Sequence, residues 1–228
     1  MFSPHTVYKW RDVFRFPSNT QRTAILGRTG SGKTQFAAWL LSHAPFHKQP
    51  YVIVDYKYDQ LLNDIEGVRE IGLKETPKKP GLYIVHPQPD DDDGIESFMM
   101  NIWKQERIGI YVDEGYMINK NSPGLTALLT QGRSKHIPAI VLSQRPAWLN
   151  RFILSEADYY SVFHMNDRRD QKTVEGFLPG NIDERLPDYH CRWYDVSKDK
   201  SFILQPVPDR DNILSRFNER LKQKRSFI

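Results

Sequence analysis

The stretch Gly27-Arg-Thr-Gly-Ser-Gly-Lys33-Thr34 matches the phosphate-binding pattern GxxxxGK[ST] at every fixed position. Directly before it, the apolar run Thr23–Leu26 has the character of a buried strand. After it, residues 33–44 carry apolar side chains at the spacing of a buried helix face, and Pro45 prevents the helix from continuing. A strand, a glycine-rich loop and a helix in this order predict a P-loop nucleotide site.

Each residue type in this loop has a role in binding phosphate. Its glycines allow backbone conformations and close approaches that a Cβ would block, so successive N–H groups can surround a phosphate. The positive end of the following helix dipole points at the same phosphates. We expect Lys33 to reach the β- and γ-phosphate oxygens and the Thr34 hydroxyl to ligate Mg²⁺, so ATP and Mg²⁺ are the predicted cofactors. The predicted binding residues are Gly27, Arg28, Thr29, Gly30, Ser31, Gly32, Lys33 and Thr34.

Two predicted strands end in an aspartate, Tyr51–Asp55 and Ile108–Asp113, but only the second continues with another acid, Glu114. A P-loop ATPase needs one carboxylate at a strand end for the metal and commonly a second one to orient the attacking water. We therefore predict that Asp113 ligates the metal and that Glu114 activates water. For Asp55, a place near the nucleotide and a solvated strand end remain alternatives.

The apolar run Ala139–Leu142 ends abruptly in Ser143 and Gln144. In a parallel sheet the carboxyl ends of the strands line the ligand crevice, so Gln144 is a candidate sensor of the γ-phosphate. Arg133 and Arg145, before and after this strand, are rival candidates for an arginine finger that reaches a neighbouring subunit's nucleotide. The alternative for either is an ordinary solvated charge.

The remaining pattern alternates strands and helices. Strands are expected at 82–85 and 159–164, helices at 95–105 and 125–132, and a hairpin at 189–195 and 201–205, followed by a basic helix at 209–225. The acidic run 90–93 is expected to be a solvated loop. We predict one α/β domain with a mostly parallel central sheet flanked by helices. Its segments are an N-terminal lead-in (1–22), a P-loop ATPase core (23–188) and an appended C-terminal hairpin and helix (189–228).

The composition restricts the setting in which the protein works. Lysine and arginine total 32 against 28 acids, a net charge of +4 that permits a nucleic-acid partner without demanding one. No run approaches the roughly eighteen apolar residues needed to span a bilayer, and the first 15 residues lack the apolar centre of a signal peptide. The single cysteine, Cys191, excludes an intramolecular disulfide. We expect a cytoplasmic protein without direct membrane insertion.

Taken in order, the motifs GRTGSGKT, VIVDYK, IYVDEG, QGRSKHIPAIVLSQRP and FHMNDRRD resemble the FtsK/HerA superfamily of DNA-pumping ATPases. The resemblance covers roughly residues 20–180. It implies a RecA/FtsK-like (ASCE) P-loop fold, a trans-acting arginine at Arg133 and a nucleotide-sensing glutamine at Gln144. The C-terminal segment 189–225 matches none of the superfamily's motifs, so its role stays open.

Within that superfamily the chain looks like the genome-packaging ATPases of tailless, internal-membrane double-stranded DNA viruses, such as the tectivirus group, because it carries neither a membrane region nor a winged-helix module. This resemblance implies an ATP-driven translocase that packages double-stranded DNA into a preformed capsid. It further implies a homo-oligomeric ring, a hexamer, with DNA in the channel and ATP between subunits. Viral vertex or membrane proteins are the implied partners. The implied locations are the host cytoplasm and the packaging vertex of the virion.

A DNA channel requires polar or cationic loops that contact phosphates. The candidates are Lys120, Arg168 and Arg169, and solvated surface charge is the alternative for each.

Three other functions fit parts of the pattern. A cellular HerA/FtsK-like DNA pump would share all these motifs, whereas a P-loop phosphotransferase acting on a small substrate would have no use for the combination of Asp-Glu and Ser-Gln-Arg-Pro. A nucleotide-gated assembly factor of the filamentous-phage export type would be expected to carry a membrane segment.

Overall fold

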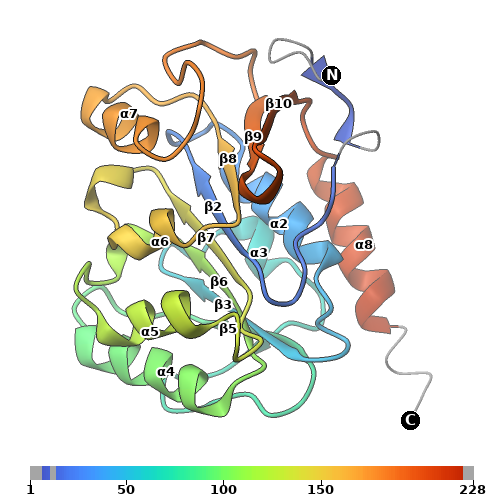
Figure 1. The fold of residues 1–228 in the computed structure, drawn as a ribbon. Coiled ribbons are helices and arrows are strands. Elements are labelled where there is room, and N and C mark those ends of the chain that lie inside the picture. The colour runs from blue at the N-terminus through green and yellow to red at the C-terminus, as the bar shows by residue number, and fades with distance from the viewer. Residues whose placement is uncertain (1–6, 11–13, 223–228) are drawn as a thin grey trace.

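The described residues, 7–10 and 14–222 of a computed structural model, form one α/β sandwich around a ten-stranded mixed sheet (Figure 1). The strand order is β1-β10-β9-β8-β2-β7-β6-β3-β5-β4. The strands are β1 (Val7–Tyr8), β2 (Arg22–Leu26), β3 (Pro50–Asp55), β4 (Arg69–Glu70), β5 (Gly81–Val85), β6 (Gly109–Asp113), β7 (Ala139–Ser143), β8 (Tyr159–Val162), β9 (Cys191–Asp195) and β10 (Lys200–Leu204). The helices are α2 (Lys33–His43), α3 (Gln60–Asn63), α4 (Asp92–Gln105), α5 (Pro123–Gln131), α6 (Arg151–Ser155), α7 (Arg168–Glu175) and α8 (Arg210–Lys222), with 3₁₀ turns η1 (Gly115–Met117), η2 (Pro146–Trp148) and η3 (Val196–Lys198).

The strand that enters the P-loop, β2, lies in the middle of the sheet. It pairs in parallel with β7 on one side and with β8 on the other. Strand β6, which ends at Asp113, pairs with the far side of β7. Because these strands are parallel, their carboxyl ends lie side by side, and residues 27, 114 and 144 follow them there. This is the place where the sequence predicts the nucleotide. The mostly parallel sheet flanked by helices that the sequence predicted is confirmed.

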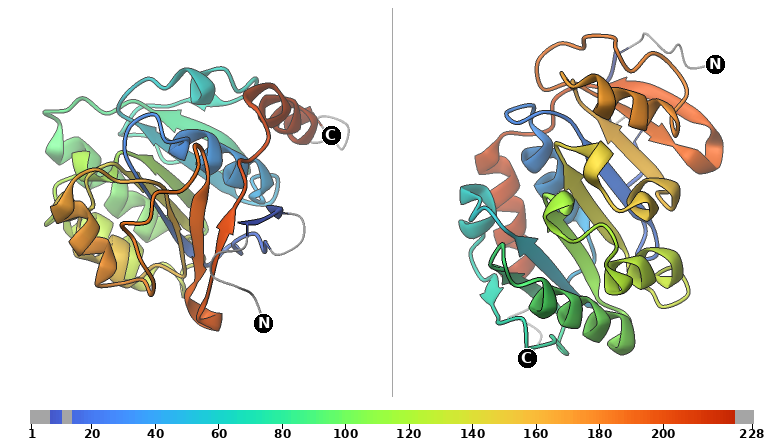
Figure 2. Two further views of the ribbon diagram at one scale, coloured as in Figure 1. Left: turned by 90° about the horizontal axis from the view of Figure 1, so that it is seen from above. Right: turned by 90° about the vertical axis from the view of Figure 1, so that its left-hand side faces the viewer.

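The sheet is buried on both faces because its central strands are apolar at successive positions. Along β3, Val52 and Val54 pack into the layer that contains α4, α5, α6 and α7, whereas Tyr51 and Ile53 pack into the layer with α2, α3 and α8. Both views of Figure 2 show α8 lying alongside α2 on this second face. The P-loop helix is thereby held between the sheet and the C-terminal helix.

One end of the sheet departs from the parallel pattern. Strand β9 runs antiparallel to β8, β10 runs antiparallel to β9, and β1 runs parallel to β10 at the edge. The hairpin predicted in 189–205 is therefore present, and its two strands extend the sheet of the P-loop segment. The predicted helix at 209–225 is present as Arg210–Lys222, and residues 223–225 of that prediction lie outside the described residues.

Two helices begin earlier in the chain than predicted. The acidic run 90–93 is exposed, as expected of a solvated loop, but only its first half precedes the helix: Asp91 caps α4 by accepting from the Gly94 N–H, and the next two aspartates occupy the first turn, where the helix dipole favours negative charge. Helix α5 begins at Pro123, two residues before the start expected at 125, because the Ser122 hydroxyl accepts from the Leu125 N–H and proline is well tolerated in a first turn. Helix α7, from Arg168 to Glu175, was not predicted.

Candidate nucleotide site

The P-loop has the backbone geometry of a phosphate cradle. Gly27, Gly30 and Gly32 have φ values of 152°, 74° and 97°, which residues with a Cβ rarely adopt. A Cβ on Gly27 would lie 2.6 Å from the Phe163 Cβ, so glycine is also required for the close approach of β8. Gly32 caps α2 without a side-chain bond, and the first turn carries no acid. The first N–H groups of α2 are therefore available to an anion.

The side chains of the loop fit a phosphate group. The buried Ser31 hydroxyl has no hydrogen-bond partner, which is the state expected of a group that meets a ligand. Lys33 is only 6% exposed and donates to the Arg28 carbonyl over 2.9 Å. Burial lowers the pKa of this lysine, while the charge of Glu114 opposes the shift. The Lys33 ammonium is thus held within the phosphate loop.

The acidic pair lies beside this loop. Asp113 and Glu114 are each 2% exposed. Burial, and secondly the charge of Glu114, raise the pKa of Asp113 to about 7. Glu114 has a φ of 58°, a left-handed conformation that is costly for glutamate and typical of residues at functional sites. Two buried carboxylates side by side, one with a raised pKa, are a suitable donor set for Mg²⁺.

Gln144 joins the acidic pair to the P-loop. Its Oε1 accepts from the Thr29 hydroxyl, and its Nε2 donates to the Tyr116 hydroxyl over 3.0 Å. Its backbone N–H donates to Glu114 Oε2 over 3.3 Å. The structure therefore brings together the P-loop, Glu114 and Gln144, three elements that are far apart in the sequence.

Lys57 is a charged member of this cluster to which the sequence reasoning gave no role. Its Nζ donates to Glu114 Oε1 and forms an ion pair with it. It follows β3 within the quoted motif VIVDYK, so the signal that could have found it was its place just past a strand next to β6. The contact with Glu114, its hydrogen bond first and then its charge, raises the pKa of Lys57 against the opposing effect of burial.

Asp55 is buried, so the solvated alternative was wrong; it lies opposite Asp113 in the pairing of β3 with β6. It is 0% exposed. Its carboxylate accepts from the Lys57 N–H at 3.0 Å, the Asp59 N–H at 2.9 Å and the Asn63 side chain at 3.1 Å. Through these three bonds Asp55 holds the turn from β3 into α3 and thereby positions Lys57.

The two candidate arginines lie at opposite ends of strand β7. Arg145 follows β7 on the nucleotide side and pairs with Asp167 at 3.1 Å and Asp170 at 3.5 Å. Arg133 precedes β7, and its side chain is 63% exposed and ion-paired with Asp158. Arg133 thus lies at the amino ends of the parallel strands, whereas its own P-loop lies at their carboxyl ends. It therefore cannot serve the nucleotide of its own subunit.

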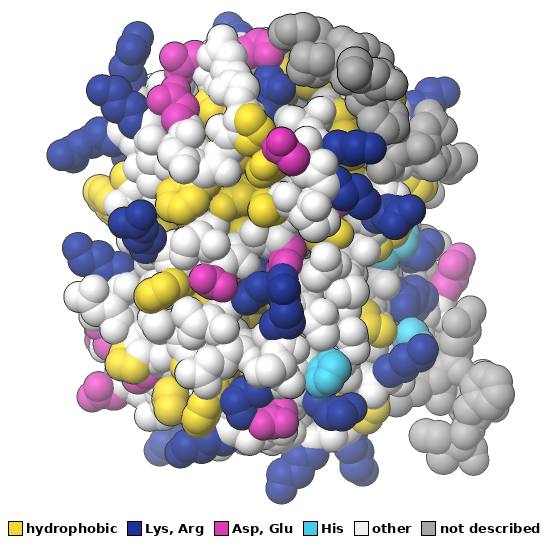
Figure 3. Space-filling model, viewed as in Figure 1, with side chains coloured by type: hydrophobic (Ala, Val, Ile, Leu, Met, Phe, Trp, Pro, Cys, Tyr) yellow, Lys and Arg dark blue, Asp and Glu magenta, His cyan; other side chains and the backbone are white. Residues whose placement is uncertain are grey.

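The three candidate DNA contacts are exposed. Lys120 lies in the turn between η1 and α5, and Arg168 and Arg169 open α7. Basic side chains on the face viewed in Figure 3 are scattered among acidic and neutral ones instead of forming a single patch. None of the helices in the described part of the chain has the length and apolarity that a membrane crossing requires.

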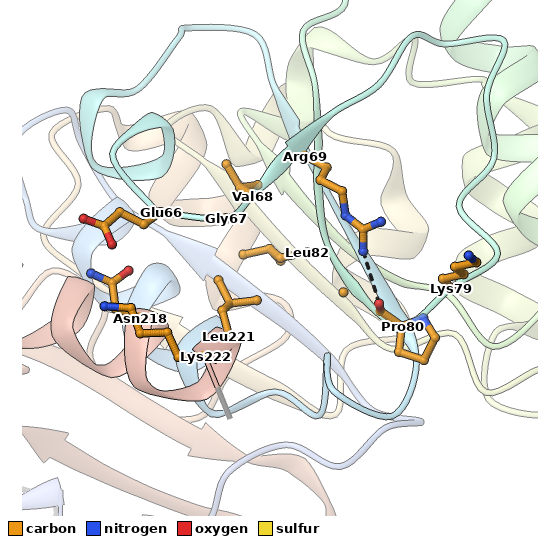
Figure 4. Close-up of a pocket in the computed structure, with 11 residues that line it drawn as sticks. Glu66, Gly67, Val68, Arg69, Lys79, Pro80, Leu82, Asn218, Leu221 and Lys222 are labelled. Carbon is orange, nitrogen blue, oxygen red and sulfur yellow. Dashed lines mark hydrogen bonds between the residues drawn. The ribbon is translucent and has the colours of Figure 1, made fainter. Parts of the chain in front are cut away.

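Away from the P-loop, a hollow of about 570 Å³ lies between the β4–β5 edge and the end of α8 (Figure 4). Val68, Leu82 and Leu221 line it, and Arg69 donates to the Pro80 carbonyl at its rim. It contains none of the residues that carry the predicted chemistry.

Comparison with known proteins decides the family. No protein-family model matches the chain. The DNA packaging ATPase P9 of Enterobacteria phage PRD1 is 44% identical over 225 residues, which cover 94% of this chain and 99% of that protein. The chain belongs to this family of DNA packaging ATPases. The predicted resemblance and the predicted ATPase activity are therefore confirmed.

The fold of this packaging ATPase also resembles that of solved structures. The genome packaging NTPase B204 of Sulfolobus turreted icosahedral virus 2, in complex with ATP-γS, has a TM-score of 0.65 at 19% identity, over 83% of this chain and 99% of that one. The EssC ATPases 2 and 3 of Geobacillus thermodenitrificans have a TM-score of 0.63 at 17% identity, over 92% and 45%. At these identities the likeness establishes the P-loop fold.

Proposed function

We propose that this packaging ATPase hydrolyses Mg²⁺-ATP in its P-loop and uses the energy to move double-stranded DNA through a ring of its own copies into a preformed capsid. The contact of Gln144 with both Thr29 and Glu114 carries the proposal, because it links the phosphate loop to the water-activating acid. The relationship to a protein named as a DNA packaging ATPase supports DNA as the transported substrate.

The residues of the site have separate roles in this proposal. The backbone of residues 27–34 and Lys33 bind the phosphates, Glu114 takes a proton from the attacking water, and Gln144 senses the γ-phosphate. Thr34 and Asp113 would hold Mg²⁺. When bound, the ion neutralises charge on the β- and γ-phosphates. Before Glu114 can act as a base it must leave its ion pair with Lys57.

Arg133 completes the neighbouring subunit's site in this proposal. Its place at the sheet edge opposite its own P-loop supports action in trans, as does the exposure of its guanidinium. Arg145 is the alternative: it lies at the nucleotide edge, but two aspartates neutralise it. Six copies in a closed ring would give every P-loop one such neighbour.

DNA contacts in the channel are proposed for Lys120, Arg168 and Arg169, which are exposed on segments that follow β6 and β8. Contacts of this kind bind phosphates without reading bases, so affinity should fall with salt and depend little on sequence. The proposed setting is the host cytoplasm and the packaging vertex, with vertex or membrane proteins as docking partners.

The test is the steady-state ATPase rate with and without double-stranded DNA, combined with light scattering. We expect stimulation by DNA and a ring-sized mass. Replacing Arg168 and Arg169 together by alanine should reduce the stimulation while leaving the DNA-free rate unchanged, and the exposed α7 lysine, in Lys172→Ala, serves as the control. A monomer that ignores DNA and phosphorylates a small acceptor would overturn the proposal.

A further inference from the structure

A second hollow adjoins the P-loop on the side away from Glu114. Its volume is about 220 Å³, and Gly32 of the P-loop forms part of its wall. Its other lining residues come from α2, the end of β8, and the segments on either side of the β9–β10 hairpin: Gln35, Phe36, Phe163, Tyr189, Pro206 and Val207. Most of the lining residues are aromatic or aliphatic, and the exposed wall is about equally polar and apolar, which suits a flat ring system with polar edges.

Tyr189 is the unusual residue of this hollow. Its side chain is 60% exposed, and its φ is 60°, a left-handed conformation that a bulky aromatic residue rarely adopts. Its ring atom Cδ1 lies 3.2 Å from the position that a Cβ on Gly32 would take, so the ring rests directly against the P-loop backbone. A strained and exposed aromatic side chain that touches a phosphate loop is better explained by a ligand than by packing.

The topology of the sheet fixes which end of a nucleotide reaches this hollow. Glu114 and Gln144 approach the loop from β6 and β7, and Gln144 contacts Thr29. Tyr189 approaches from the opposite side, where β8 and β9 lie. A triphosphate whose γ-phosphate faces Glu114 must therefore extend its ribose and base past Gly32 toward Tyr189.

Gln35 supplies a polar group with a defined direction. Its side-chain Nε2 donates to the Pro208 carbonyl over 2.8 Å. Because a carbonyl can only accept, the amide nitrogen must face it, and Gln35 can offer a ligand its amide oxygen and the second N–H of that nitrogen. Used as an acceptor at the 6-position of a purine, the oxygen favours the amino group of adenine over the oxygen of guanine.

We propose that this hollow is the base-binding subsite of the ATPase, in which Tyr189 stacks on the purine ring and Gln35 accepts from the adenine amino group. The subsite rests on one part of the proposed function, the binding of phosphates by residues 27–34, and is independent of DNA transport. It makes ATP the preferred nucleotide over GTP.

The experiment is calorimetric titration of the full chain with Mg²⁺-ATP, Mg²⁺-GTP and Mg²⁺-tripolyphosphate. Stacking on an aromatic ring predicts that Tyr189→Ala weakens ATP binding about tenfold or more, that Tyr189→Phe keeps it, and that tripolyphosphate binding changes less than about twofold in both. Gln35→Leu should bring the affinities for ATP and GTP together. Tyr58→Ala is the matched control, since Tyr58 is 58% exposed with a φ of 55° but stacks on His86.

The outcomes are distinguishable. Unchanged ATP binding in Tyr189→Ala would overturn the subsite while leaving the P-loop assignment intact. Equal losses of ATP and tripolyphosphate in that variant would also overturn it, because Tyr189 would then only support the loop. Lys33→Ala should lose both ligands; if it keeps both, the phosphate assignment itself fails.

Discussion

At the scale of single residues, the proposed catalytic base, Glu114, can be tested most directly. Glu114→Gln keeps the shape of the side chain but removes the base, so hydrolysis should fall by about 10²–10⁴-fold while ATP affinity changes little. Single-turnover hydrolysis and equilibrium titration separate the two quantities. Glu219→Gln, on the exposed side of α8, is the control. Normal turnover in Glu114→Gln would show that another residue acts as the base.

The ion pair between Lys57 and Glu114 predicts an effect in the opposite direction. Lys57→Met keeps the side-chain length but frees the carboxylate, so the DNA-free ATPase rate should rise about fivefold, since a half-exposed charge-assisted bond contributes on the order of 1 kcal/mol. The stimulation by DNA should shrink by a similar factor. The exposed lysine in Lys74→Met is the control. A slower enzyme would show that Lys57 positions Glu114 for the reaction instead of restraining it.

The chemistry-bearing residues on fixed motifs could be predicted because their types and spacing follow directly from phosphate chemistry. Lys57 and Tyr189 were not singled out, because their contacts join segments that are distant in the sequence. Asp55 was ambiguous for the same reason. Only the fold shows that its carboxylate is buried and accepts from three donors of the segment that follows β3.

At the scale of elements, the end of α2 carries a pH-sensitive contact. Burial lowers the pKa of His43 from 6.5 to about 4. Its ring stacks on Phe16 with centroids 3.8 Å apart, and its Nδ1 lies 2.9 Å from the Trp39 carbonyl. Between pH 6.5 and 4 the unfolded chain binds the proton that the folded chain refuses, so the stabilising contribution is present above pH 6.5 and is lost as the pH falls toward 4.

We therefore expect that, between pH 7 and pH 5, the free energy of unfolding falls less in the His43→Gln variant than in the unsubstituted protein. The difference should be about 1 kcal/mol after the partial exposure of the ring is discounted. Urea unfolding at a series of pH values measures it. Parallel stability curves for the two proteins would contradict the assignment.

The junction of β2, the P-loop and β8 predicts a second element-scale effect. Gly27→Ala adds a methyl group 2.6 Å from the Phe163 Cβ at a φ of 152°, so it should cost about 2 kcal/mol or more of unfolding free energy and weaken ATP binding. Gly176→Ala is the matched control, because Gly176 is right-handed and its nearest neighbour is 3.5 Å away. Thermal melting compares them.

Elements with strong periodicity were predictable, and their ends were not. The buried strands β3 and β5 appear within one residue of their expected bounds, because a continuous apolar run fits only a strand covered on both faces. The starts of α4 and α5 moved upstream because side-chain caps outweighed the loop-forming tendency of aspartate, serine and proline. Helix α7 was missed because only two of its residues, Asp170 and Val174, are buried, which leaves little apolar pattern to detect.

At the scale of the whole molecule, action of Arg133 in trans predicts complementation. Arg133→Ala and Lys33→Ala should each be nearly inactive alone. A one-to-one mixture restores interfaces in which an intact arginine faces an intact P-loop, about a quarter of all interfaces in a randomly mixed ring. The ATPase rate of the mixture should therefore exceed the sum of the two separate rates. A mixture no more active than its components would contradict the trans role.

The position of β2 in the sheet also has a consequence for biosynthesis. Strand β2 is made first among the central strands, yet it ends between β7 and β8, which are made later. Strands β3, β5 and β6 can pair with one another as they leave the ribosome, whereas the segment that enters the P-loop must wait until residues 159–162 exist. The nascent chain thus carries an unpaired apolar segment through most of its synthesis, a state open to chaperones and to misassociation. The nascent chain can therefore bind ATP only late in its synthesis, after these strands have paired.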